Sequence, residues 1–208
     1  MKSDITGVIL AGGKSSRIGS DKSFLNISGE QFISRILSTM QSVFSEVIIS
    51  TNNSEPYKIF GVELVQDIIS SIGPLSGIYS TLKYADTEKI FVSSCDMPLI
   101  DADIIKNILN INTDAQVILP VINLIPQYDF GIYEKSILPQ IENLISSRDE
   151  KVSLKKLIPL VKTTLIKVEE LPAYNEWTFL NINTIENYQR LKEMHANSSP
   201  FEKKNDEK

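Results

Sequence analysis

Short apolar runs alternate with longer amphipathic segments along most of the chain. The short runs end at small or polar residues, as TGVIL does before a pair of glycines, which is typical of buried strands. The longer segments place apolar residues at helical spacing, for example Phe32, Ile36 and Met40. This pattern predicts strands at residues 6–10, 47–49, 62–66, 90–93, 117–119, 130–133 and 165–168, and helices at residues 31–44, 75–84, 101–109, 136–145, 153–160 and 184–194.

Alternation of strands with helices predicts an α/β fold. We expect a single three-layer α/β/α domain over residues 1–196, with a Rossmann-like, mostly parallel sheet between two layers of helices. Ligands of such sheets bind beyond the carboxyl ends of the strands, so the loops after the strands are the place to look for chemistry. Residues 197–208 are polar and charged, and we expect a disordered tail there.

Composition narrows the classes of function. The chain has 208 residues and a formal net charge of −5, which disfavours a protein that coats nucleic acid. One cysteine, Cys95, leaves no internal disulfide, and one histidine, His195, leaves no histidine-based metal cluster or Ser–His–Asp triad. We find neither a secretory signal nor an apolar run long enough for a membrane span, and we predict a cytoplasmic protein.

A glycine-rich segment, LAGGKSSRIGSDK at residues 10–22, directly follows the first predicted strand. The adjacent Gly12 and Gly13 let the backbone approach a ligand closely and turn its N–H groups into one concavity. Arg17 and Lys22 add positive charge for phosphate oxygens. The spacing is neither that of a Walker loop nor that of a dinucleotide fingerprint. We interpret the segment as a triphosphate-binding loop, against the alternative of a solvent loop with incidental charge.

The same segment resembles the signature of sugar-nucleotidyltransferase-like enzymes, L-A-G-G-x-S-x-R-M-G-x-D-K, and is most similar to that of the molybdenum cofactor guanylyltransferases (the MobA family). Further blocks resemble the family in the same order: VIISTN, GPLSG, CDMP, QYDFGIY and FLNINT. They span nearly the whole chain and imply a fold of the nucleotide-diphospho-sugar transferase type. The chain departs from the family at Glu30, where the family has Lys, and at Tyr128 and Asp129, where it has Pro and Leu.

Two carboxylates follow predicted strands. Asp96 comes after IFVSSC, where an oxygen ligand suits Mg²⁺ that bridges phosphates, although a turn aspartate is the alternative. The resemblance favours the metal. Asp67 ends another strand and could accept from the paired N–H donors of guanine, or serve ordinary turn chemistry. Cys95 has no histidine to activate it, so we expect a small buried residue rather than a nucleophile.

Four amide side chains complete the predicted site. Asn52 fits a left-handed turn residue, whereas the resemblance implies contact with the ribose or base. Asn181 and Asn183 alternate along one segment and face the same side; they are candidates for a second metal contact or a pterin contact, with helix capping before Thr184 as the alternative. With Gln127, they form the predicted acceptor-binding set.

The resemblance implies transfer of GMP from GTP to molybdopterin, with release of pyrophosphate and with Mg²⁺ as cofactor. In this interpretation Arg17, Lys22 and Asp96 are the catalytic residues and Asp96 holds the metal. GTP and molybdopterin are the small-molecule partners, and transient contact with molybdenum-cofactor proteins is implied. The resemblance assigns nucleotide contacts to Leu10, Ala11, Gly12, Gly13, Lys22, Asn52, Asp67, Gly77 and Asp96.

Two other functions stay open. Related enzymes use CTP, or transfer nucleotides to sugar phosphates; the LAGG and GPLSG blocks resemble the guanine-selecting form more than the cytosine-selecting form. The second alternative is a nucleotide-binding carrier without transfer activity, motivated by Glu30, Tyr128 and Asp129 on the acceptor side. Retention of Arg17, Lys22 and Asp96 argues against a carrier.

Overall fold

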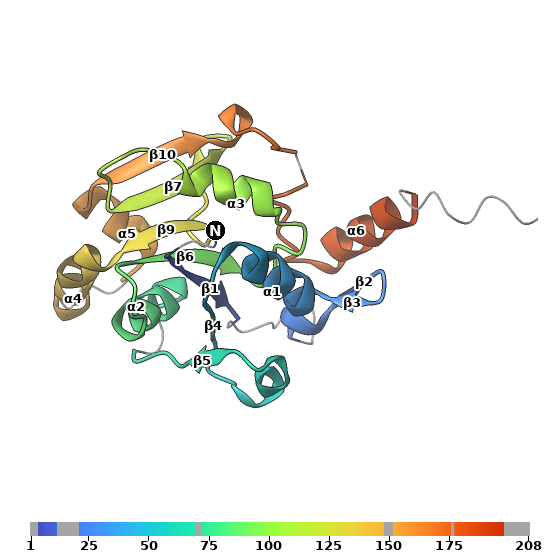
Figure 1. Cartoon of the computed structure of the whole chain (residues 1–208), viewed down its shortest axis with the longest axis horizontal. Coiled ribbons are helices and arrows are strands. Elements are labelled where there is room, and N and C mark those ends of the chain that lie inside the picture. The colour runs from blue at the N-terminus through green and yellow to red at the C-terminus, as the bar shows by residue number, and fades with distance from the viewer. Residues whose placement is uncertain (1–3, 12–20, 70–71, 148–151, 176, 198–208) are drawn as a thin grey trace, which may run out of the picture.

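The computed structural model of the chain describes residues 4–11, 21–69, 72–147, 152–175 and 177–197. Its strands are β1 (Thr6–Leu10), β2 (Asn26–Ile27), β3 (Glu30–Gln31), β4 (Val47–Ser50), β5 (Glu63–Val65), β6 (Lys89–Ser94), β7 (Val117–Ile122), β8 (Ile125–Pro126), β9 (Gly131–Glu134) and β10 (Thr163–Lys167). Its α-helices are α1 (Phe32–Val43), α2 (Pro74–Tyr84), α3 (Ala102–Leu109), α4 (Leu138–Ser146), α5 (Leu154–Leu157) and α6 (Ile185–Asn197). Figure 1 shows their arrangement.

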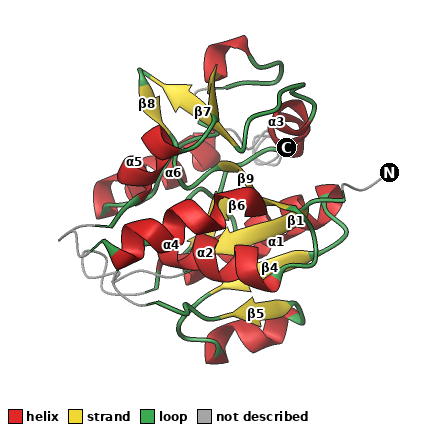
Figure 2. Ribbon diagram, turned by 90° about the vertical axis from the view of Figure 1, so that its left-hand side faces the viewer, coloured by secondary structure: helices red, strands yellow, loops and turns green. Residues whose placement is uncertain are grey.

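One mixed sheet runs through the middle of the described residues. Its strand order is β10-β7-β9-β6-β1-β4-β5, and β8 pairs with β7. Helices α1 and α3 pack on one face, and α2 and α4 pack on the other (Figures 1 and 2). Side chains of β1 alternate between the faces, because Ile9 joins the core under α1 whereas Val8 and Leu10 join the core under α2. The structure confirms the predicted three-layer α/β architecture.

The parallel strands β5, β4, β1 and β6 lie side by side at one end of the sheet. Their carboxyl ends therefore meet at one edge. Strand β9 differs, because it runs antiparallel between β6 and β7. No helix separates β7 from β9, only the short strand β8, and a connection without a crossover helix returns the chain antiparallel. The sheet is thus mostly parallel, as predicted, with an antiparallel insertion that the hydrophobic pattern did not indicate.

A two-stranded hairpin, β2–β3, lies outside this sheet and was not predicted. Its turn residues Ser28 and Gly29 both have positive φ, as a two-residue type I′ turn requires. Helix α6 packs beside the hairpin (Figure 1), where Leu191 shares a buried cluster with Ile27 and Phe32. The phenol of Tyr188 donates to the backbone oxygen of Asn26 over 2.6 Å. The end of the described chain is thereby held next to the segment that follows the glycine-rich loop.

Element ends differ from the predictions by a few residues. The predicted strand at 165–168 spans Thr163–Lys167, and the predicted helix at 184–194 continues to Asn197. The predicted tail lies otherwise outside the described residues, and so does most of the glycine-rich loop. In the part of the chain that the structure describes, no helix has both the length and the apolar character needed to cross a membrane.

Candidate active site

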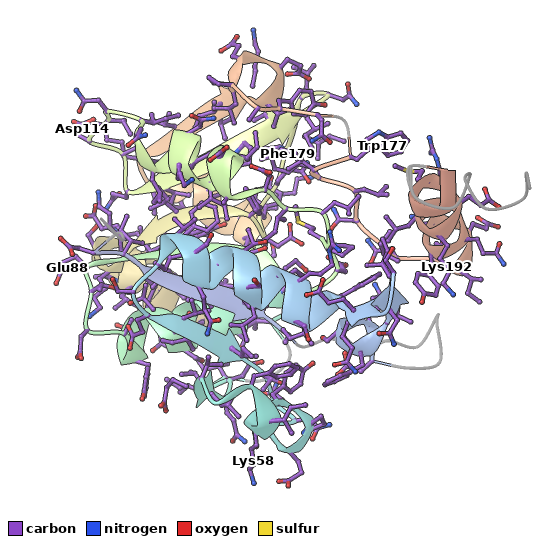
Figure 3. All side chains as sticks on the ribbon, turned by 45° about the vertical axis from the view of Figure 1, so that its right-hand side comes forward. Lys58, Glu88, Asp114, Trp177, Phe179 and Lys192 are labelled. Carbon is purple, nitrogen blue, oxygen red and sulfur yellow. The ribbon has the colours of Figure 1, made fainter. Side chains whose placement is uncertain are left out.

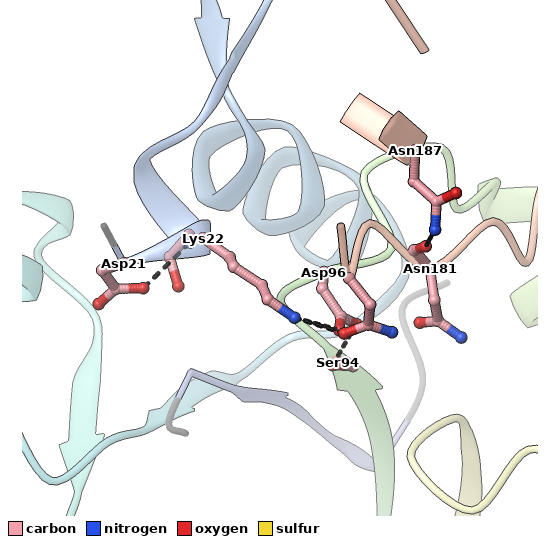
Figure 4. A network of polar contacts seen from close by, with 8 residues as sticks. Asp21, Lys22, Ser94, Asp96, Asn181 and Asn187 are labelled. Atoms are coloured by element: carbon pink, nitrogen blue, oxygen red, sulfur yellow. Dashed lines mark hydrogen bonds and ion pairs between the residues drawn. The ribbon is translucent and has the colours of Figure 1, made fainter. Parts of the chain in front are cut away.

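Three polar side chains meet beyond the carboxyl end of β6, and we call them the cation end: Lys22, Asp96 and Asn183. The Lys22 ammonium lies 3.6 Å from Oδ2 of Asp96 and donates to Oδ1 of Asn183 (Figure 4). The side chains of Lys22 and Asp96 are only 17% and 14% exposed, so water screens their attraction less than at an open surface. The sequence predicted each residue separately, and the fold brings all three together.

Asp96 is held in place by its neighbours. Ser94, the last residue of β6, donates its hydroxyl to Oδ1 of Asp96 over 2.7 Å. The backbone N–H of Ile182 donates to the backbone oxygen of Asp96 over 2.9 Å. The second bond ties the segment of Asn181 and Asn183 to the end of β6. One carboxylate oxygen is therefore positioned by a serine, and the other faces the Lys22 ammonium.

The backbone of Lys22 is fixed by a separate cluster. Lys22 begins a short 3₁₀ helix (Lys22–Phe24) whose N-cap, Asp21, accepts from the backbone N–H of Ser23 over 3.0 Å. The phenol of Tyr57 donates to Oδ2 of Asp21 over 2.9 Å and lies 2.8 Å from Oγ of Ser23. Burial raises the pKa of Tyr57 far above its usual value, so this phenol stays a donor. These contacts fix the backbone from which the four-carbon side chain of Lys22 extends.

The segment after Phe179 carries one unsatisfied oxygen. Oδ1 of Asn181 is buried and has no hydrogen-bond partner among the residues that the structure describes. Its backbone oxygen accepts from the amide of Asn187 over 3.2 Å, and Figure 4 shows its side chain on the same side of the site as Asp96. Thr184 caps α6, because its hydroxyl accepts from the backbone N–H of Asn187 over 3.1 Å. Capping therefore falls to Thr184, and the side chains of Asn181 and Asn183 are available to the site.

A second carboxyl group lies close enough to Asp96 to be affected by its charge. Burial first, and then the negative charge of Asp96, raise the pKa of Asp129 from 3.8 to about 6. Asp129 lies in the turn between β8 and β9, where the backbone N–H of Phe130 donates to the oxygen of Gln127 over 3.2 Å. This is the position at which the chain departs from the Leu expected by resemblance. Among the described residues, two carboxyl groups and one ammonium thus lie at or beside the cation end.

The other end of the site, which we call the base end, consists of Asn52 and Asp67. The amide of Asn52 donates to Oδ2 of Asp67 over 2.7 Å, and the backbone N–H of Asp67 donates to Oδ1 of Asn52 over 3.1 Å. The two residues follow the neighbouring parallel strands β4 and β5. The next backbone N–H, of Ile68, donates to Ser80 on α2 over 2.8 Å. Asp67 therefore stands in a loop that is anchored on both sides.

Comparisons with known proteins identify the family of the chain. The family model described as MobA-like NTP transferase domain matches residues 7–162. The chain belongs to the MobA-like NTP transferase family. It is similar to a protein of Clostridium perfringens (strain 13 / Type A) named probable molybdenum cofactor guanylyltransferase, with 35% identity over 89% of this chain and 95% of that protein.

Solved structures share the fold as well. A protein of Aquifex aeolicus VF5 is 31% identical, has a TM-score of 0.72, and aligns over 86% of this chain and 93% of that one. Molybdopterin-guanine dinucleotide biosynthesis protein A from Archaeoglobus fulgidus has a TM-score of 0.78 at 19% identity, with 93% and 100% of the two chains covered. As a family member the chain is a nucleotidyltransferase, and its α/β fold is that of the family.

The family's glycine-rich block is described at its edges only. The backbone N–H of Ala11 donates to the oxygen of Ser50 over 2.8 Å, and the oxygen of Leu10 accepts from Cys95 over 3.1 Å. These bonds continue the pairing of β1 with β4 and β6 to the start of the block. Gly12, Gly13 and Arg17 lie outside the described residues, so their roles stay predictions.

Gly77 packs where α2 crosses the ends of β1 and β4. A Cβ atom there would lie 2.7 Å from Oγ of Ser50 and 2.8 Å from Cδ2 of Leu10, closer than side chains allow. Glycine at this position of the GPLSG block therefore lets the helix approach the strands. Its predicted contact with a nucleotide stays a prediction.

Other predicted residues have local partners. The amide of Gln127 donates to the backbone oxygen of Ile125 over 2.9 Å, so it braces its own turn, and its acceptor role stays a prediction. Burial raises the pKa of the Cys95 thiol to about 12, as expected of a buried residue that is no nucleophile. In Figure 3, Phe179 points into the molecule, and the centroid of its ring lies 5.2 Å from that of Phe130. Trp177 lies nearer the surface, under the guanidinium of Arg190.

Three supporting residues were not predicted: Ser94, Asp21 and Tyr57. Two of them had a local signal. Asp21 precedes the family lysine and is a preferred N-cap residue, and Ser94 stands two positions before Asp96, within reach of its carboxylate. Tyr57 gave no signal, because its contact with Asp21 spans 36 positions and depends on tertiary packing.

Proposed function

We propose that the chain transfers GMP from GTP to a molybdopterin cofactor and releases pyrophosphate. The observation that carries the proposal is the meeting of Lys22, Asp96 and Asn183 beyond β6. The Asn52–Asp67 pair lies on the same edge, after the strands two and three positions away. Such a layout suits phosphates at the cation end and a base at the base end. The names of the relatives, which specify molybdenum cofactor and guanylyl transfer, support the choice of substrates.

The oxygen atoms of the cation end fit Mg²⁺. The cation end supplies the carboxylate of Asp96 and the amide oxygen of Asn183, and the neighbouring Asn181 adds a buried oxygen that has no partner among the described residues. Mg²⁺ prefers oxygen ligands and usually takes one or two protein carboxylates together with phosphate oxygens. Asp96 would hold the ion, which would supply neutralising charge where the α- and β-phosphates lie.

Lys22 stabilises the negative charge that develops on the α-phosphate and on the leaving pyrophosphate. Its backbone is fixed through Asp21 and Tyr57, so little reorganisation accompanies the contact. The attacking group, a terminal phosphate of molybdopterin, is already an anion and needs no general base. Asp129 and Asp96 therefore need not remove a proton, and catalysis consists of alignment and charge neutralisation.

Asp67 selects the base. Guanine presents neighbouring N–H donors on one edge, and a carboxylate accepts from two such donors, whereas cytosine presents an acceptor next to its amino group. The amide of Asn52 uses one lone pair of Oδ2 of Asp67, so Oδ1 and the other lone pair of Oδ2 can accept from the two guanine donors. Losing a hydrogen bond to a charged group typically costs about 1.5–3 kcal/mol, enough for a strong preference between bases.

Thermal unfolding with a nucleotide panel tests this proposal. In the presence of Mg²⁺, GTP should raise the melting temperature of the full chain more than CTP, ATP or UTP at equal concentration. Stabilisation by CTP but not by GTP would contradict the choice of base. Stabilisation by GTP without pyrophosphate release, once molybdopterin is added, would favour a nucleotide-binding carrier. Contact with molybdenum-cofactor proteins and a cytoplasmic location stay predictions.

A further inference from the structure

We propose that the Lys22 ammonium fills the divalent-cation position of the ligand-free protein, and that Lys22 and the cation exchange when nucleotide binds. In the described structure one ammonium contacts both an Asp96 carboxylate oxygen and the Asn183 amide oxygen. These are the two kinds of oxygen that a hard divalent cation prefers. The geometry therefore assigns Asn183, with Asp96, to the cation site, and assigns Lys22 a second position besides its place on the phosphates.

The surroundings of Lys22 indicate an occupied cation position rather than a surface ion pair. Within the described residues, Asp129 places a second carboxyl group near Asp96, and its raised pKa reflects burial and the Asp96 charge. Asn181 adds a buried oxygen that accepts no hydrogen bond within the described part of the chain. A region with two carboxyl groups and two amide oxygens attracts positive charge, and Lys22 is a cation that the described structure places there. Asn183 lies 161 positions away from Lys22, so this contact requires the docked α6 segment.

Lys22 and a divalent cation cannot share these oxygens. The ammonium donates to Asn183, and an amide oxygen that ligates a metal at close range has no room for an ammonium beside it. Repulsion between the two positive charges acts in the same direction. Lys22 has a flexible stem on a fixed backbone, so it can swing without unfolding the 3₁₀ helix that carries it.

The triphosphate supplies the new partner for Lys22. This step rests on the proposed function, which places phosphates next to the cation end. When phosphates arrive, Lys22 gains anionic oxygens and releases Asp96 and Asn183 to the cation. Binding of nucleotide and binding of cation are therefore positively coupled, and the coupling is reciprocal. Free cation alone binds weakly, because it must displace the ammonium from Asp96 and Asn183 when no phosphate is present to bind the ammonium in exchange.

Binding of Mn²⁺ to the nucleotide-free protein tests the exchange directly. The full chain is titrated with Mn²⁺, and the free ion is followed by electron paramagnetic resonance. Lys22→Met keeps the length of the side chain and removes its charge. A neighbouring charge alters an ionisation equilibrium by about ten- to a thousand-fold. We therefore expect Lys22→Met to bind Mn²⁺ at least about tenfold more tightly than the wild type, and Asn183→Ala in that background to lose most of the gain.

A matched control separates this effect from net charge. Lys83 also pairs with a carboxylate, Glu142, over 2.9 Å, but lies on α2 outside the site. Lys83→Met removes the same charge and should leave Mn²⁺ affinity at the wild-type value. Thermal unfolding verifies that each variant is folded, and Lys22→Gln serves if Lys22→Met is not.

Several outcomes would overturn the exchange. They are an unchanged or weaker Mn²⁺ affinity in Lys22→Met, an equal gain in Lys83→Met, and a gain that persists after Asp96→Ala. Addition of a non-hydrolysable GTP analogue should tighten Mn²⁺ binding in the wild type more than in Lys22→Met. Because the titration without nucleotide requires no transfer, a failed transfer assay with an intact Mn²⁺ result would contradict the proposed function alone.

Discussion

The base end and the cation end of the site differ in how their polar groups are satisfied. At the base end, Asn52 and Asp67 exchange two hydrogen bonds and form a closed pair. At the cation end, one ammonium faces Asp96. Beside it, Asn181 keeps an oxygen without a partner among the described residues, and Asp129 is charged above its raised pKa of about 6. The first arrangement is preorganised by neighbouring strands, and the second has an excess of acceptors.

This difference indicates which kind of ligand each end is suited to bind. A closed pair presents a fixed recognition edge and gains specificity, because a ligand that fails to match leaves charged groups unpaired. An excess of oxygen acceptors attracts cations and the phosphates that accompany them. If this account is correct, changes at the cation end reduce turnover, whereas changes at the base end alter the choice of nucleotide.

Removing the charge of Lys22 is the strongest way to break the cation end. Lys22→Ala should lower turnover roughly 10²–10³-fold, since one preorganised contact is worth about 2.7–4 kcal/mol of barrier. Chemical denaturation should show a folded protein. Lys83→Ala, on α2, is the matched control and should retain wild-type turnover. Steady-state pyrophosphate release measures both variants, and near-normal rates in Lys22→Ala would disprove the role of this residue.

Neutralising Asp67 tests base recognition at the base end while it keeps the Asn52–Asp67 pair in place. In Asp67→Asn the amide oxygen can still accept from Asn52, but the charge facing the base is lost. The preference for GTP over ITP, which lacks the 2-amino donor, should fall by about 1.5–3 kcal/mol while kcat changes little. Asp103→Asn, on the exposed first turn of α3, is the control. An unchanged GTP/ITP ratio of kcat/KM would mean that Asp67 does not read the base.

Substitution of Asp129 tests how the negative charge beside the cation end affects stability. The pKa of Asp129 is raised in the folded protein, so the unfolded chain releases this proton first. Ionisation of Asp129 therefore does not affect the free energy of unfolding below about pH 4. It lowers this free energy as the pH rises from about 4 to 6, and the loss persists above about pH 6. One pKa unit corresponds to about 1.4 kcal/mol. Allowing for partial exposure, Asp129→Leu should stabilise the protein by about 1–2 kcal/mol at pH 7.

Urea unfolding at pH 4 and pH 7 measures this gain, which should nearly vanish at the lower pH. Asp129→Asn separates charge from packing, because it is similar in shape and uncharged. If Asp129→Asn shows no gain at pH 7 while Asp129→Leu does, packing rather than charge explains the effect. Equal gains at both pH values would contradict the raised pKa.

A substitution at Gly77 tests the packing next to the base end with the smallest expected effect. Overpacking costs about 1–3 kcal/mol, and replacing a helical glycine by alanine returns about 1 kcal/mol. Gly77→Ala should therefore lower stability by about 1 kcal/mol. Ser50→Ala removes the nearest atom, at 2.7 Å from the new Cβ, and should recover part of the loss in the double variant. Additive effects of the two substitutions would show that they do not touch.

The sequence predicted the part of the site that follows from the order of strands and helices along the chain. Asn52, Asp67 and Asp96 each follow a parallel strand by two positions, so their convergence on one sheet edge follows from the α/β pattern. The contact of Lys22 with Asn183 was not predictable, because it depends on α6 docking against the β2–β3 hairpin. The antiparallel β9 was missed for a similar reason, since a short apolar run does not reveal its direction.

One assay addresses the central claim most directly. GTP carrying a radioactive α-phosphate is mixed with the full chain, Mg²⁺ and molybdopterin, and the pterin fraction is separated. If the protein is a guanylyltransferase, label enters the pterin product in step with pyrophosphate release, and labelled CTP transfers far less. Label that stays in GTP, or transfer that proceeds better from CTP, would contradict it.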